Sequence, residues 1–132
     1  DGQTRAKPLE KRNMFLTSVG ASGTSGKRIA PKVMGTDKED WGHDVVVDDS
    51  GDVHLAGMSR GNPSGDASDD GLLVTITPSS PMHRWIGKNG QTERIQALAA
   101  GPKHIYAVGF AAGSFSELPH SGKDDAFVVR VE

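Results

Sequence analysis

The chain has 132 residues, with 15 Lys and Arg against 17 Asp and Glu, and a formal net charge of −2. This balance excludes the overall basic surface that nucleic-acid-binding domains present. The sequence has no cysteine, which excludes a disulfide framework and thiolate metal sites. No apolar run approaches the roughly 18 residues that a membrane helix needs. Apolar residues make up only 35% of the chain and glycine contributes 17 residues, a composition typical of short strands and tight turns.

Charge is unevenly distributed along the chain. Residues 1–35 carry seven Lys and Arg against two acidic residues, whereas residues 36–132 carry eight against fifteen. Residues 1–12 also lack periodicity, so we expect a basic flexible arm there and tandem repeats over residues 13–132. The arm either stays solvated or docks on an acidic partner or an anionic membrane surface. Its basic side chains are Arg5, Lys7, Lys11 and Arg12.

The first half of the chain predicts strands separated by glycine-rich loops. Residues 13–19 alternate in polarity and predict a strand, and a second short strand is expected near residues 29–35. Residues 43–48 and 52–57 predict a hairpin turned by Asp49-Ser50-Gly51, because glycine accepts the positive φ of such turns. A polar loop, a strand over residues 70–76, a turn and a strand ending at Gly87 follow.

The second half predicts the same order of elements. Residues 95–99 and 104–109 form a second hairpin, turned by Gly101-Pro102-Lys103, where the fixed φ of proline suits a turn. A long loop leads to a last strand over residues 125–131. No window shows helical periodicity, so the predicted class is all-β.

The two halves align with a step of 52 residues. Residues 53–58 fall on 105–110, which places His54 at the position of Tyr106, and residues 45–47 fall on 97–99, which places His43 at the position of Ile95. Residues 32–35 likewise fall on 84–87. A step of this size indicates one supersecondary unit copied in tandem. The copies span about residues 31–77 and 83–131.

One strand of the unit occurs three times. Residues 70–76 resemble residues 125–131 at a step of 55, and residues 13–19 show the same pattern 57 residues before residues 70–76. Four short strands per unit is the strand count of a β-propeller blade. We therefore predict about two propeller-type blades in an open arc: half a blade, a full blade and a blade lacking its last strand.

The same residues resemble a known repeat family. Val45-Val46-Val47-Asp48-Asp49-Ser50-Gly51-Asp52-Val53-His54-Leu55-Ala56-Gly57 is similar to the core of the SBBP repeat of seven-bladed β-propellers. Asp124-Asp125-Ala126-Phe127-Val128-Val129 resembles the Asp-Ala-Phe-Val strand of that family, and Trp85-Ile86-Gly87 its Trp-x-x-Gly-Gly segment. The resemblance covers about residues 13–131. It implies a propeller fold, no common catalytic residues, and an extracytoplasmic, surface or organelle-lumen location.

Motifs that could carry chemistry are incomplete. Residues 57–61 spell Gly-x-Ser-x-Gly, but Pro63 follows where a nucleophile elbow needs a helix. Residues 20–28 resemble a phosphate loop but have Ala21 and Arg28 at positions where Gly and Ser or Thr are required. We therefore predict no catalytic residue, no enzyme activity and no cofactor. A weak calcium candidate is left at Asp48, Ser50 and Asp52, which more simply cap the hairpin.

The predicted arc leaves unpaired strand edges, which invite association with other protein. The chain is then a piece of a longer propeller, one copy in a ring, or a subunit of a larger complex; a self-contained sandwich is the alternative. The leading hypothesis is a non-catalytic structural or interaction subunit, and a carbohydrate-binding module using Trp41, Trp85 or Tyr106 is the second. The predicted contact residues, besides the basic arm, are Phe15, Leu16, Phe127 and Val129.

Overall fold

The computed structural model describes residues 12–16, 32–61, 65, 68–77, 81–87, 90–113 and 122–131. Over these residues the chain forms nine β-strands in three antiparallel sheets and no helix, so the predicted all-β class is confirmed. No helix in this part of the chain is long and apolar enough to cross a membrane.

The three sheets follow one another in chain order. The first sheet pairs β1 (Met14–Leu16) with β2 (Lys32–Met34). The second sheet holds, in spatial order, β3 (Asp40–Val47), β4 (Val53–Ser59), β5 (Asp70–Ile76) and β6 (Pro81–Ile86). The third sheet holds β7 (Thr92–Ala100), β8 (Ile105–Ala112) and β9 (Asp125–Val131). Sheets of two, four and three strands match the predicted strand count.

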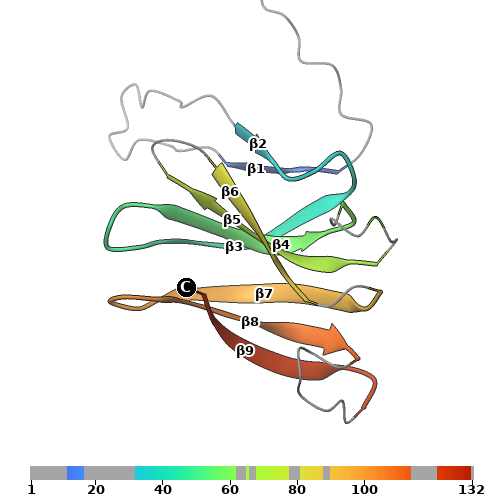
Figure 1. The fold of residues 1–132 in the computed structure, drawn as a ribbon. Coiled ribbons are helices and arrows are strands. Elements are labelled where there is room, and N and C mark those ends of the chain that lie inside the picture. The colour runs from blue at the N-terminus through green and yellow to red at the C-terminus, as the bar shows by residue number, and fades with distance from the viewer. Residues whose placement is uncertain are drawn as a thin grey trace, which may run out of the picture.

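The sheets lie one over another, with the first at the top of Figure 1 and the third at the bottom. Successive side chains of a strand point to opposite faces of its sheet, so the second sheet contributes to two apolar layers. Leu55 and Val74 pack with residues of the first sheet. Ala56 and Leu73, their chain neighbours, pack with residues of the third sheet. The middle sheet is therefore covered on both faces.

Strand pairing confirms most of the predicted repeat. Gly57 pairs with Leu72 and Gly109 pairs with Phe127, which agrees with steps of 52 and 55. Met14 pairs with Met34 as Gly71 pairs with Ile86, which agrees with the step of 57.

The step of 52 is wrong for the strand that opens each unit. Gly42 lies opposite Gly57, and Ile95 lies opposite Gly109, so β3 and β7 are related by 53 residues. A β-bulge follows at the same place in both strands, where His43 and Gln96 have no opposite partner. The counterpart of His43 is therefore Gln96, not Ile95.

The bulge explains a glycine that recurs in the partner strand. A Cβ added to Gly57 would collide with the carbonyl oxygen of Trp41, and one added to Gly109 would collide with that of Arg94. Only glycine permits this close approach of two backbones.

The same backbone hydrogen bond links each sheet to the next. The amide of Asp40 donates to the carbonyl of Arg12 at 3.0 Å, and the amide of Glu93 donates to the carbonyl of Asp69 at 2.7 Å. Arg12 and Asp69 occupy equivalent positions, as do Asp40 and Glu93. The relation between the first and second sheets is thus repeated between the second and third.

Candidate interaction surfaces and an inter-sheet pocket

The third sheet has an exposed apolar face on the side away from the second sheet. Tyr106, Val108 and Val128 lie on this outer face and are 40%, 38% and 71% exposed. Their counterparts in the second sheet, His54, Ala56 and Leu73, are 7%, 0% and 1% exposed because the third sheet covers them. The outer face of the third sheet, defined by Tyr106, Val108 and Val128, is thus the uncovered version of an interface that is buried one repeat earlier.

The predicted contact residues of the last strand are corrected by this arrangement. Phe127 is 7% exposed and lies in the core between the second and third sheets, and Val129 packs against the same core. Because side chains alternate along β9, Val128 between them takes the outer face. Neither Phe127 nor Val129 is therefore available to a partner in this structure.

The predicted contact residues near the start of the chain lie at the opposite end of the stack. Phe15 of β1 is 65% exposed, and Leu16 is half-buried. Arg12 is exposed, and its guanidinium lies 5.3 Å from the centre of the Trp41 ring, a cation–π distance. The remaining predicted arm residues, Arg5, Lys7 and Lys11, lie outside the described residues.

A groove of about 520 Å³ runs between β1 and the face of β3, and we call it the β1 groove. Its apolar lining comes from Met14, Phe15, Trp41, Val45 and Leu55. The sequence gave no direct signal for this groove, because it arises where the first sheet has only two strands above the four of the second.

An Arg–Asp cluster joins the second and third sheets at the start of β5. Asp69 accepts hydrogen bonds from Nε of Arg60 at 2.8 Å and from Arg94 at 2.7 Å, and only 8% of its side chain is exposed. Burial raises the pKa of Asp69, but the hydrogen bonds and charges of the two guanidinium groups outweigh burial and leave the pKa below its ordinary value. Arg60 also bonds Glu39 at 2.6 Å. Sequence reasoning missed this cluster because its members are 9 to 34 residues apart and share no motif.

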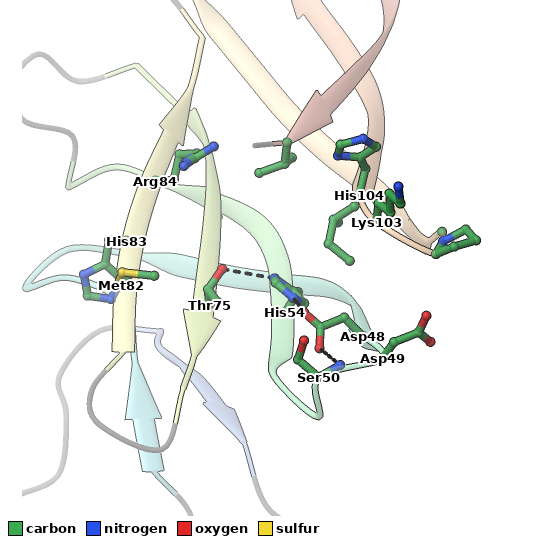
Figure 2. A pocket seen from close by; sticks show the side chains of 14 residues that line it. Asp48, Asp49, Ser50, His54, Thr75, Met82, His83, Arg84, Lys103 and His104 are labelled. Carbon is green, nitrogen blue, oxygen red and sulfur yellow. Dashed lines mark hydrogen bonds and ion pairs between the residues drawn. The ribbon is translucent and has the colours of Figure 1, made fainter.

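A pocket of about 400 Å³ lies between the second and third sheets, beside the turn of the β3–β4 hairpin (Figure 2). Arg84 on β6 and Lys103 and His104 near the β7–β8 turn place basic groups around it. Asp48 and Asp49 of the other hairpin add carboxylates. The lining therefore carries both signs of charge.

A chain of polar side chains forms one wall of this pocket. Nε2 of His54 lies 3.0 Å from Oδ2 of Asp48, and Nδ1 lies 3.0 Å from the hydroxyl of Thr75 (Figure 2). Neutral His54 then donates from Nε2 to the carboxylate and accepts from Thr75 at Nδ1. The hydrogen bond from His54 lowers the pKa of Asp48. Both ring nitrogens are engaged, which leaves neither available to a metal or a substrate without rearrangement.

The residues of the weak calcium candidate are arranged as a turn cap. Oδ1 of Asp48 accepts from the amides of Ser50 at 2.9 Å and Asp52 at 3.0 Å, while its Oδ2 faces His54. Such side-chain to backbone bonds stabilise hairpin turns. Among the described residues no group of three or more His, Asp and Glu side chains could hold a metal ion.

The three aromatic residues of the carbohydrate hypothesis lie in unlike environments. Trp85 packs against the core between the first and second sheets, Trp41 lines the β1 groove, and Tyr106 lies on the outer face of the third sheet. By repeat position they correspond to Val33, Arg94 and His54, so the described residues contain no aromatic site that recurs from unit to unit. Comparison of the sequence with protein-family models and with curated proteins finds no match.

Proposed function

We propose that this chain is a non-catalytic structural or interaction module of the β-propeller type, which associates by packing sheet on sheet. Each of its sheets supplies part of a blade, in the order half blade, full blade and three-stranded blade. The observation that carries the proposal is the contrast between the outer face of the third sheet and the same positions of the second sheet. Leu73 is fully covered, and Val128 in the same position is 71% exposed.

The opposite end of the stack offers the complementary surface. Phe15 occupies the position of Leu72, which is 0% exposed beneath the first sheet, yet Phe15 itself is 65% exposed. A second chain placed by the same repeat relation would set its Phe15 side against the outer face of the third sheet. Association of this kind joins two different surfaces, so it closes into a ring or extends as a filament.

The polar groups near the inter-sheet pocket fit a structural role. Asp48 and His54 bond each other, the turn backbone and Thr75, so their hydrogen-bonding capacity is used within the protein. Asp69 similarly neutralises part of the charge of two arginines at the sheet junction. These groups stabilise the stack of sheets.

Sedimentation velocity from micromolar to millimolar concentration tests the proposal. The chain is expected to form species larger than one copy, and Val128→Glu should remove them because a carboxylate would have to be buried without a partner. Val47→Glu is the matched control, since Val47 is 58% exposed but lies on β3. A chain that stays monomeric throughout, or associates equally well with Glu at position 128, would contradict the proposal.

A further inference from the structure

The strand β1 has an edge that its counterparts do not leave open. Within the described part of the chain, β1 pairs with β2 alone. Its counterparts β5 and β9 pair on the other edge with β4 and β8. The first sheet thus lacks, beside β1, the strand that the second and third sheets both possess. An open edge presents backbone N–H and C=O groups that another strand can bond.

The β1 groove lies where that strand would have its side chains. Val45, on the groove floor, is 48% exposed, whereas its counterpart Leu98 is 9% exposed within the core of the next sheet pair. Trp41 and Leu55 continue the apolar floor, and Met14 and Phe15 form the side that belongs to β1. The groove therefore combines an unpaired backbone edge with an apolar floor.

We propose that β1 accepts an extended protein segment as an added antiparallel strand, with the side chains of that segment covering the β1 groove. The structure shows the pattern of such a segment twice, in β4 beside β5 and in β8 beside β9. Strand addition of this kind obtains affinity from main-chain hydrogen bonds and specificity from side-chain pockets. The occupant is thus a segment of alternating apolar residues like β4, rather than a small molecule.

The register identifies one required residue. Phe15 takes the position of Leu72 and Phe127, and both of these lie opposite a glycine. In the third sheet the ring of Phe127 lies 2.8 Å from the place where Gly109 would carry a Cβ, so a larger residue would clash with the aromatic ring. The added strand should therefore place glycine opposite Phe15. This surface is distinct from the outer face of the third sheet, so the inference does not depend on the proposed function.

A peptide with the β4 sequence, Asp52–Arg60 with blocked termini, is the probe. Its binding to the isotope-labelled chain should be saturable and should shift the amide resonances of β1 and β3. A peptide with leucine in place of Gly57 should bind about tenfold more weakly or worse, a loss of the size that one steric clash produces. Unchanged affinity for the leucine peptide would overturn the register.

Two matched protein variants locate the binding site. Val45→Asp should abolish peptide binding because it places a charge on the groove floor, whereas Val47→Asp, two residues along the same strand and outside the groove lining, should bind normally. Far-ultraviolet circular dichroism checks that both variants retain the fold. No saturable binding, or binding that survives Val45→Asp, would overturn the inference. Loss of binding with Val128→Glu would instead place the peptide on the third sheet and equally refute it.

Discussion

Val128 takes the position in the third sheet that Leu73 takes in the second, but Val128 is 71% exposed and Leu73 is 1% exposed. The difference has one physical cause, which is that the third sheet covers Leu73 and no described residue covers Val128. The pairing of each residue with the neighbouring strand is the same, since Leu73 lies opposite Ala56 and Val128 lies opposite Val108. An internal interface and an open surface thus share one pattern.

Truncating these two residues should give very different losses of stability. Leu73→Ala removes side-chain atoms from a fully packed layer and should lower the free energy of unfolding by about 2–5 kcal/mol. Val128→Ala in the dilute chain should change it by less than about 0.5 kcal/mol, as surface substitutions do. Urea unfolding followed by tryptophan fluorescence measures both. Equal losses would show that the third sheet does not cover Leu73 in solution.

Gly57 should not tolerate a side chain. Gly57→Ala places a methyl group against the carbonyl of Trp41 and should destabilise the chain by at least about 1–3 kcal/mol, as overpacking does. Gly122→Ala is the control, because a Cβ at Gly122 meets nothing within 4 Å. Thermal unfolding compares the two variants. A Gly57 variant as stable as the Gly122 variant would argue against the bulge next to Trp41.

The Arg–Asp cluster should make stability depend on acid. The pKa of Asp69 in the folded chain is below its ordinary value of 3.8, so the folded state favours the carboxylate. Its contribution is complete above the unfolded pKa and is lost as pH falls through the folded pKa. Asp69→Asn should be less stable than the parent near neutral pH, and the difference should shrink below about pH 4. A difference that persists unchanged in acid would mean that charge is not its source.

The bond between Thr75 and His54 should also contribute measurably. Thr75→Val keeps the shape of the side chain but leaves Nδ1 of the 7%-exposed His54 without the hydroxyl. We expect a loss of about 1–3 kcal/mol, the cost of a buried polar group that loses its partner. Chemical denaturation near pH 8, where His54 is neutral, gives the value. No loss at that pH would mean that water replaces the hydroxyl.

The fold could be predicted from the sequence because its signals are local. The turn of the β3–β4 hairpin was predicted at residues 49–51, and Gly51 has the expected positive φ of 85°. The repeat of apolar positions located the strands, and the spacing of like segments predicted their grouping into sheets of two, four and three. Each of these inferences depends on residues adjacent in the chain or on a fixed step.

The site could be predicted only in part, because it depends on relations between sheets. A one-residue lengthening between Gly87 and Glu93, compared with Gly35 and Asp40, shifts β7 against β3, and no local signal marks it. The choice of Phe127 rather than Val128 as a contact residue failed because alternation defines two faces but does not say which one the preceding sheet covers. The ends of the stack, where function is proposed, are thus the least predictable part.

The most direct test of sheet-on-sheet association is to mix two chains that are blocked at opposite ends. Phe15→Glu removes the surface at the first sheet and Val128→Glu the surface at the third, so each variant alone should sediment as a single copy. Each still carries the surface that the other lacks, and an equimolar mixture should therefore form a complex of one copy of each and nothing larger. A mixture that contains only single copies, while the parent chain associates, would contradict the pairing of the Phe15 end with the Val128 face.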